Sequence, residues 1–395
     1  MNSHPPSRSS GLFGRPVLTI TIVLAILAGI GVGSVAFANR SDGPKPQWRE
    51  PVRAAPVKPA AASTAPPSPT APVAAITMSA TGDIMMSNAP GRMPPADGAG
   101  FFDSVRADLE ADLVMGNLEQ PLTGDTGTTK CGSPPTPNCF AYRSPPSYSA
   151  HLKEAGFELM NLANNHTRDF GTAGARNTRA ALDDAGIKYT GNQDEITVVV
   201  VKGIKVAVVG FAGYSGANNL NDLDHSREVI KKAEEQADLV VVQVHMGAEG
   251  ATMQHVKPGN EIFHGENRGD PIKFSHAVID AGADVVIGHS PHVLRGMEFY
   301  RGKLIAYSLG NFAGGGRTLS SQGVLKYGGV LRVTLARDGT YVGGQFRSTY
   351  MSSVGLPIRD TTNEKGRKLV AELGAADFGD TAATIAEDGS IRPPA

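Results

Sequence analysis

The sequence predicts an α/β fold for the larger part of this 395-residue chain. Strand and helix signals alternate from Ile76 onward, and most strand-like runs are continuously apolar, as in buried strands. Polar motifs follow five of these apolar runs. From Met297 onward the pattern changes to strands alone, so we expect an antiparallel portion after the alternating part.

The five motifs place polar residues at the ends of predicted strands. They are GDIMMS (82–87), GNLEQP (116–121), NNHTRDFG (164–171), VHMGAE (244–249) and GHSPHV (288–293). Carboxylates, carboxamides and imidazoles at the carboxyl ends of parallel strands suit metal binding, because a crevice opens at that edge of such a sheet. The first hypothesis is therefore a metal-dependent hydrolase site.

The start of the chain is expected to lie outside the folded body. Residues 17–38 carry no charge and are long enough to cross a bilayer, whereas a cleavable signal core is usually about 7 to 15 residues. We expect a cytoplasmic N-terminus over 1–16 and a transmembrane signal anchor over 17–38. Ala36-Phe37-Ala38 fits a cleavage site, so release after Ala38 is the alternative. More basic residues follow the span than precede it, which favours the opposite orientation, with the N-terminus outside the cytoplasm.

Composition separates a linker from the folded body. Residues 39–74 are rich in Pro, Ala, Ser and Thr, so a disordered linker is expected there. The main domain is expected over 75–360, followed by a C-terminal helix and tail over 361–395. Lysine plus arginine (37) nearly balance aspartate plus glutamate (38), so nucleic-acid binding is not expected.

The first half of the body contains three strand and helix alternations. Strands are expected at 76–82 and 112–119, around a helix that begins near Phe102. A short helix at 147–156 starts at a serine and ends at a glycine. A strand at 157–164 and a helix at 172–186 follow.

The second half begins with a hairpin signal. Two β-branched runs in residues 196–211 are separated by Lys202-Gly203. The alternation then continues with a helix at 226–237, a strand at 238–245, a helix at 271–282 and a strand at 283–289. The final strands are expected in MEFYRG, KLIAYSLGNF, GGVLRVTLARDG and TYVGGQFRSTYM.

Cys131 and Cys139 are the only cysteines, and they bracket a loop rich in Pro, Gly and Ser. Their short spacing, with nothing like a metal tetrad around them, predicts a local disulfide in an oxidising compartment. Two free thiols are the alternative. With the signal-like ending of the apolar segment, this pair favours a body outside the membrane.

Asp83 and Glu119 are the carboxylates of the first two motifs. Asp83 follows a strand and a glycine, so a tight turn can project it into the crevice, although such an aspartate is often only a cap. Glu119 stands beside Pro121, which stops the strand. It is a candidate second ligand, or a general base if no metal binds it.

The third motif pairs a histidine with an acid. Asn165 and His166 follow an apolar strand, and Asp169 lies three residues later, within reach to orient the imidazole. The alternative is an asparagine-rich turn in which Asp169 caps the next helix.

The last motifs supply three more histidines. His245 ends a valine-rich strand; alone it would be read as a structural residue, but it recurs with the other motifs. His289 and His292 stand across a turn fixed by proline, a good metal signal. YSLGNF places Asn311 near the crevice, with a core strand ending in a turn as the equal alternative.

Six motifs occur in one order between about Ile76 and Ser352: GDIMMS, GNLEQP, NNHTRDFG, HMGAE, GHSPHV and YSLGNF. In this order they resemble the CapA family of bacterial capsule and poly-gamma-glutamate synthesis proteins, which look like relatives of calcineurin-type metallophosphoesterases. The resemblance implies a metallophosphoesterase-like αββα sandwich, preceded by an N-terminal membrane anchor, with the body outside the cytoplasm.

The same resemblance implies a role for each motif residue. Asp83 resembles the first-motif aspartate, and Glu119 lies where those enzymes place a bridging carboxylate. Asn165 resembles the metal-binding asparagine. His166, paired with Asp169, resembles the histidine that assists the leaving group.

The remaining histidines also match the resemblance. His245 and His289 resemble metal ligands, and His292 resembles the last ligand or a phosphate contact. The implied cofactor is one or two divalent ions (Mn, Zn or Fe). Met85 departs from the pattern, because metallophosphoesterases usually have a histidine there. The first metal would lose a nitrogen ligand, which puts a two-metal site in question.

Three functions follow. The first is a hydrolase acting on phosphoester or amide bonds of an envelope polymer. The second is a non-catalytic accessory protein that binds an anionic polymer at the membrane, with polymer synthase subunits as expected partners. The third is a cell-wall binding module, expected only if the motif residues are buried and hydrogen-bonded to one another without room for an ion.

Overall fold

The computed structural model describes residues 74–137 and 139–394. The predicted cytoplasmic N-terminus, the signal anchor and all but the last residue of the predicted linker lie outside the described residues. All the described residues belong to one compact unit. In that described part, no helix is both long enough and apolar enough to cross a membrane.

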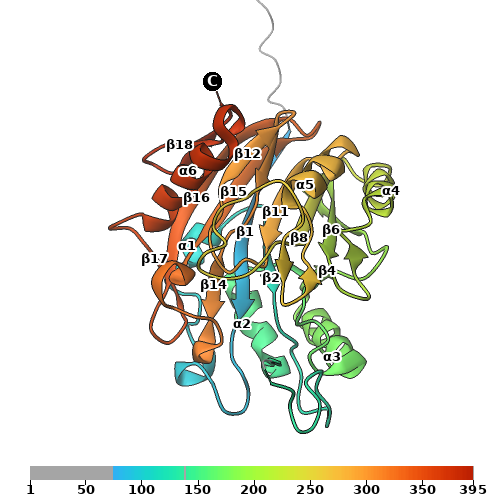
Figure 1. Ribbon diagram of the computed structural model, residues 1–395, viewed down its shortest axis with the longest axis vertical. Coiled ribbons are helices and arrows are strands. Elements are labelled where there is room, and N and C mark those ends of the chain that lie inside the picture. Colours follow the sequence, from blue (N-terminus) through green and yellow to red (C-terminus); the bar gives the residue numbers. More distant parts are fainter. Residues whose placement is uncertain (1–73, 138, 395) are drawn as a thin grey trace, which may run out of the picture. The chain divides into compact units, whose positions relative to one another are not determined.

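The first sheet has ten strands and is mixed (Figure 1). β1 lies at its centre and pairs in parallel with β2 on one side and antiparallel with β15 on the other. β14 also pairs in parallel with the end of β1. The strands are β1 (Ala75–Met85), β2 (Leu113–Leu118), β3 (Leu159–Asn161), β4 (Lys188–Thr190), β14 (Asn311–Gly314), β15 (Tyr327–Ala336), β16 (Tyr341–Met351), β17 (Pro357–Arg359), β18 (Thr384–Ile385) and β19 (Ser390–Arg392).

The second sheet has seven strands and is also mixed, with the order β12-β13-β11-β8-β6-β5 and with β7 beside β6. β13, β11, β8 and β6 run parallel, whereas β12 and β5 are antiparallel edges. The strands are β5 (Thr197–Val201), β6 (Ile204–Ala212), β7 (Asn218–Asn219), β8 (Leu239–His245), β11 (Val285–His289), β12 (Met297–Tyr300) and β13 (Lys303–Ala306). β9 (Ile262–Phe263) and β10 (Glu266–Asn267) form a separate small hairpin.

Three clusters of buried apolar side chains hold the sheets and helices together in layers. One lies between the sheets and joins Met78 of β1 and Met115 of β2 to Val208 of β6 and Val241 of β8. A second packs the first sheet against α1 (Arg106–Leu109), α2 (Ser149–Ala155) and α3 (Gly171–Asp184). A third packs the second sheet against α4 (Leu223–Glu234) and α5 (Pro271–Asp280). The two sheets therefore face each other, with helices on both outer faces. α6 (Lys365–Phe378) adds Val370 to the central cluster and contacts β12, β15 and β16.

The predicted α/β class and most of the predicted elements are confirmed. The hairpin at Lys202-Gly203 joins β5 to β6, and both turn residues have positive φ. The predicted disulfide between Cys131 and Cys139 is present. The range 361–395 contains α6, and its last residues form the β18–β19 hairpin, which joins the first sheet.

Several predicted boundaries were wrong. The helix expected near Phe102 spans only Arg106–Leu109, because Phe101 and Phe102 turn into the core before it. The strand expected over 157–164 is limited to Leu159–Asn161, since the side chains of Asn161 and Asn164 accept from the backbone N–H groups of Ala163 and His166 in the turn that follows. β4 was not predicted, and KLIAYSLGNF forms two strands, β13 and β14, in different sheets.

Candidate metal centre and hydrolytic site

Strand register brings the motifs together. Asp83 is paired with Asn117 of β2 and with Asn311 of β14, while His245 of β8 is paired with His289 of β11. The five motifs are divided between two facing sheets. They do not lie along the edge of one doubly wound sheet. The site forms where the carboxyl ends of both sets of parallel strands meet.

Asp83 is held at the end of β1 by close backbone packing. A side chain at Gly82 would collide with the carbonyl oxygen of Gly310, which also accepts from the Asp83 N–H at 3.0 Å. Asp83 is fully buried, and its Oδ1 accepts from Asn117 Nδ2 at 2.8 Å. Burial alone would raise the pKa of Asp83, but hydrogen bonding to His292 and the charge of His292 lower it.

Glu119 and His245 form a buried pair across the two sheets. Glu119 Oε1 lies 2.9 Å from His245 Nε2, and both side chains are fully buried. Burial, followed by the negative charge of Asp83, raises the pKa of Glu119. Burial, followed by the positive charge of Arg268, lowers the pKa of His245.

His292 approaches three carboxylates from a strained turn. Its φ is 58° and that of Ser290 is 101°, so both occupy the left-handed region that non-glycine residues rarely adopt. His292 Nδ1 lies 3.1 Å from Asp83 Oδ2 and 2.9 Å from Asn311 Oδ1, while Nε2 lies 3.7 Å from Glu119 and 3.6 Å from Glu249. Burial opposes protonation, yet the charge of Glu119 and the bond to Asp83 raise the pKa of His292 to about 10.

His289 lies beneath this turn. Its Nε2 is 3.2 Å from Gln243 Oε1, and its Nδ1 is 3.7 Å from Asp83 Oδ1. Burial lowers the pKa of His289 to about 4, against the opposing charge of Asp83. A neutral imidazole is the form that binds metal ions.

The donor set fits a divalent cation. Asp83, Glu119 and His292 each offer a ligand atom, and these atoms lie within 4.8 Å of one another. Among the described residues, Glu119 Oε2, His245 Nδ1 and His289 Nδ1 are buried atoms without a hydrogen-bond partner, and the partner of Asp83 Oδ2 is His292 alone. Buried polar atoms are normally satisfied, so this concentration of free oxygen and nitrogen atoms is what a metal ion would satisfy.

Asn165 sits apart from the other five predicted ligands. It lines the same cavity as His292, but in the described part of the chain no hydrogen bond or ion pair joins its side chain to Asp83, Glu119 or a histidine. The geometry therefore links Asp83, Glu119, His245, His289 and His292 directly, and places Asn165 at the rim.

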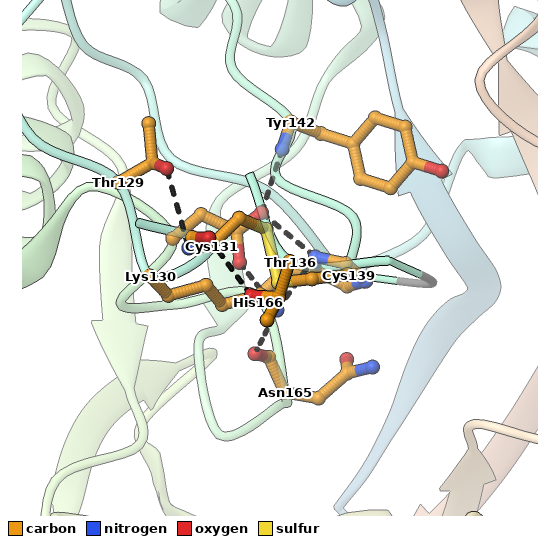
Figure 2. The surroundings of a disulfide bond; sticks show 9 residues. Thr129, Lys130, Cys131, Thr136, Cys139, Tyr142, Asn165 and His166 are labelled. Carbon is orange, nitrogen blue, oxygen red and sulfur yellow. Dashed lines mark hydrogen bonds and ion pairs between the residues drawn. A yellow bond between two sulfur atoms is a disulfide. The ribbon is translucent and has the colours of Figure 1, made fainter. Parts of the chain in front are cut away.

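His166 and Asp169 form the predicted pair beside this group. His166 Nδ1 lies 2.7 Å from Asp169 Oδ2, and the backbone N–H of His166 donates to Asn164 Oδ1 at 3.1 Å. With Nδ1 taken by Asp169, Nε2 is the nitrogen left to act in the cavity. Burial lowers the pKa of His166 although Asp169 opposes this shift. Figure 2 shows His166 beside the disulfide between Cys131 and Cys139.

A cavity of about 760 Å³ opens above these residues. His166 and His292 both line it, and Met85 forms part of its wall. Met85 thus occupies the place where the resemblance implies a histidine, and it provides no nitrogen ligand. Phe140 is 61% exposed and stacks with Tyr142, another residue of the cavity wall.

Several contributors were not predicted as site residues. Asn117 donates to Asp83, and its Oδ1 accepts from Asn161 and Asn164 at 3.0 and 3.1 Å. Asn117 and Asn164 lie inside two of the sequence motifs, so their positions near strand ends could have marked them as site residues. The position of Glu249, four residues after His245, could have done the same.

No sequence motif marks two basic residues that also contact the site. Arg268 reaches Glu249 at 2.7 Å, and Lys130 reaches Asp169 at 2.7 Å, each from a long loop.

The fold and site define a class: an α/β protein of two facing mixed sheets with a buried group of carboxylates and histidines that can hold a metal ion. The family model described as "Bacterial capsule synthesis protein PGA_cap" matches residues 77–315, more than half of the chain. The chain belongs to this family.

Relatives support the same membership. The capsule biosynthesis protein CapA of Bacillus anthracis is 33% identical over 261 residues, which cover 60% of this chain and 59% of that protein. The PGA biosynthesis protein CapA of Bacillus subtilis (strain 168) is 31% identical over 256 residues, covering 60% and 63%. The match thus spans less than two thirds of either relative.

Among solved structures, a hypothetical protein from Thermus thermophilus is 18% identical, with 69% of this chain and 98% of that chain covered. Its TM-score is 0.42. The fold described above therefore rests on the strand order and packing of this chain.

Proposed function

We propose that this chain acts in the synthesis or export of a capsule or poly-gamma-glutamate polymer and hydrolyses a phosphoester or amide bond with the aid of a divalent metal ion. The observation that carries the proposal is the convergence of Asp83, Glu119 and His292 beneath an open cavity, with unpartnered oxygen and nitrogen atoms among the buried side chains. Family membership supports the polymer context.

The residues around the cavity divide into two roles. Asp83, Glu119, His245, His289 and His292 would hold the ion, with Asn165 at the rim. When bound, one or two ions of Mn, Zn or Fe would supply Lewis acidity, which polarises a phosphoryl or acyl oxygen and acidifies water. His166 Nε2 would donate a proton to the leaving group, while Asp169 fixes the ring through Nδ1.

The proposed fold relationship is to metallophosphoesterases. Two facing mixed sheets with helices on both outer faces, and a polar site at the carboxyl ends of the strands, support a metallophosphoesterase-like αββα sandwich. Met85 argues for an incomplete version of that site, in which one metal position has fewer nitrogen ligands.

The proposed location is the outer side of the cell membrane, with the segment 17–38 as a single-pass anchor. The disulfide supports an oxidising compartment. Cleavage after Ala38 would release the body instead. The proposed partners are the membrane, an anionic envelope polymer and subunits of a polymer synthase.

Metal analysis of the purified chain, followed by assays on phosphodiesters and on gamma-linked glutamate polymers, tests the proposal. We expect bound metal in the native chain and a strong loss of metal and activity in Asp83→Ala and His289→Ala. The exposed Asp380→Asn variant serves as a control. Protein that binds no metal under any condition would end the hydrolase proposal.

A non-catalytic accessory role is the second candidate. The site residues already bond to one another, as in Glu119 with His245 and Asp83 with Asn117, which is how a structural polar network would look. The expectation for a wall-binding module is met only in part, because unpartnered ligand atoms remain. A strain carrying a folded His289→Ala protein that still secretes the full amount of polymer would favour the accessory role.

A further inference from the structure

The described residues 124–137 and 139–143 belong to the loop between β2 and α2, which is closed by the disulfide between Cys131 and Cys139. It packs against the turn that carries His166 and Asp169. Figure 2 shows Lys130, Tyr142 and the disulfide gathered around His166. Nothing in the proposed hydrolytic mechanism uses this loop.

Lys130 makes four contacts with three residues of the turn. Its backbone N–H donates to the carbonyl oxygen of Asp169 at 2.8 Å, and its Nζ donates to the carbonyl oxygen of Asn165 at 3.1 Å. Nζ also lies 2.7 Å from Asp169 Oδ1 and 3.4 Å from His166 Nδ1. One residue thus holds both ends of the turn on which His166 stands.

The two oxygens of Asp169 have different partners. Oδ2 accepts from His166 Nδ1 and from the backbone N–H of Tyr142, each at 2.7 Å. Oδ1 faces Lys130, the only lysine or arginine that pairs with Asp169 among the described residues. The carboxylate is fully buried, and a buried charge that loses its charged partner is strongly destabilised. Lys130 therefore supplies the positive charge that compensates the buried Asp169 carboxylate.

The disulfide places both contacts that the loop makes with Asp169. Lys130 directly precedes Cys131, and Tyr142 follows Cys139 by three residues. Within the closed loop, Thr136 donates to the carbonyl oxygen of Cys131 through its N–H at 2.8 Å, and Cys139 donates to that of Thr136 at 3.2 Å. The ring of Tyr142 meets that of His166 edge-on, with 5.1 Å between centroids. Lys130 and Tyr142 flank the two cysteines, so the cross-link that limits the conformations of the loop also holds the two residues near each other.

We propose that Lys130 is a positioning residue, which acts through Asp169 to fix the ring orientation and tautomer of His166, and that the disulfide-closed loop is the part of the fold that supplies it. The expected effect of Lys130 on the reaction rate rests on the proposed role of His166 as a proton donor. The effect on the imidazole itself does not depend on any activity. Without the ammonium group, the buried Asp169 carboxylate has no charged partner, which weakens its hold on Nδ1 of His166, the contact that leaves Nε2 free in the cavity.

The test uses the purified full chain in two measurements. Selective ¹⁵N labelling of histidine reports the tautomer of His166, assigned by comparison with His166→Gln. We expect the Nδ1-protonated form in the native protein, its loss in Lys130→Met, and its recovery in Lys130→Arg, which keeps the charge. Lys232→Met, a change at an exposed lysine of α4, should leave the signal unchanged.

The kinetic measurement separates positioning from binding. Because Lys130 is engaged with Asp169, we expect Lys130→Met to lower kcat by about tenfold or more with little change in KM. Lys130→Arg should restore most of the rate. If Lys130→Met does not fold, as judged by circular dichroism, Lys130→Gln takes its place.

The outcomes are distinct. A native tautomer in folded Lys130→Met would overturn the positioning role. A native tautomer in the Cys131→Ser/Cys139→Ser double variant, beside a changed one in Lys130→Met, would overturn the role of the loop. An altered tautomer in both variants, in a protein that shows no hydrolysis even in its native form, would support the inference while ending the proposed hydrolase function.

Discussion

Asn117 shows how a single uncharged residue organises the candidate site. It lies between the ends of β1 and β3, donates to Asp83, and accepts from both Asn161 and Asn164. The carboxamide has both a donor and an acceptor, so it can join an ionised acid to two further amides, which a carboxylate at the same place could not do.

Asn117→Ala should lower the free energy of unfolding by about 1 to 3 kcal/mol, because Asp83, Asn161 and Asn164 each lose a buried partner. Chemical denaturation measures this loss. The exposed Asn192→Ala is the matched control and should change stability by less than about 0.5 kcal/mol. Equal effects of the two substitutions would show that the network does not stabilise the fold.

At the scale of residues, the strand-end positions of the candidate ligands could be predicted from the sequence, whereas their contacts could not. Asp83, His245 and His289 lie at the ends of apolar strands and Glu119 directly follows one, and strand ends are positions that a sequence pattern reveals. Lys130 and Arg268 reach the site from long loops whose paths depend on packing, so no local pattern marks them. Glu119 was expected as a ligand or base, and its close pairing with His245 depends on how two sheets face each other.

α6 illustrates how an element begins without a capping residue next to it. Glu364, at the position before the helix, has a φ of 47° and makes no capping bond. Asp360 takes over this role from a distance, since its carboxylate accepts from the N–H groups of Asn363 and Lys365 at 3.0 and 2.9 Å. Burial would raise the pKa of Asp360, but these backbone hydrogen bonds lower it.

The depressed pKa of Asp360 gives a pH-dependent prediction. Its contribution is fully present above the ordinary aspartate pKa and is lost as the pH falls through the lower value in the folded state. Asp360→Asn should therefore cost about 1 to 2 kcal/mol of unfolding free energy near pH 7 and clearly less near pH 3. Urea denaturation at both pH values measures this, with Asp380→Asn as the exposed control. A cost that does not change with pH would contradict the proposed capping.

Arg295 fixes the segment over residues 247–269, which supplies Arg268 and Phe263 to the cavity. The guanidinium is fully buried, pairs with both oxygens of Glu261 at 2.9 and 2.7 Å, and donates to the carbonyl oxygen of Met253. A bidentate pair of this kind fixes both position and orientation.

Arg295→Met should destabilise the chain by about 3 to 5 kcal/mol, because it leaves Glu261 without its cation in a buried place. Adding Glu261→Gln should recover part of the loss. Hydrogen exchange should rise over 247–269 in the single variant. Arg301→Met, which removes an exposed pair with Asp280, should cost less than about 1 kcal/mol. No recovery in the double variant would argue against the pair as the cause.

At the scale of elements, long periodic segments were predictable and short ones were not. α3, α5, β6 and β8 fall close to their expected ranges because each has a clear apolar pattern. β3 and β4 have three residues each, too few to show a period. β13 and β14 belong to different sheets, but residues 307–310 between them do not interrupt the strand-like sequence pattern. The two strands were therefore predicted as one.

The whole molecule depends on the contact between two sheets, and the candidate ligands come from both. Asp83 and Glu119 lie at the ends of strands of the first sheet, whereas His245 and His289 end strands of the second. An ion held by both groups would resist separation of the sheets.

Metal binding should therefore stabilise the folded chain. For an ion that binds only the folded state, the unfolding free energy rises by about 2.7 kcal/mol at a concentration of 100 times Kd. Thermal unfolding of the EDTA-treated chain with increasing Mn²⁺ measures this increase. Asp83→Ala should show almost none of it, whereas Asp380→Asn should show all of it. An equal increase in Asp83→Ala would place the ion elsewhere.

The position of β1 also governs the order in which the chain can fold. β1 is made early, yet two of its three partner strands, β14 and β15, come from the last third of the sequence. Until those residues leave the ribosome, one edge of β1 is open and the first sheet cannot be completed. A growing chain of this kind should stay unfolded until its synthesis is nearly finished, the state in which polypeptides are threaded through a translocation channel. Protease sensitivity of ribosome-bound chains that end before Asn311, beside full-length chains, tests this expectation; early protection of the β1 segment would refute it.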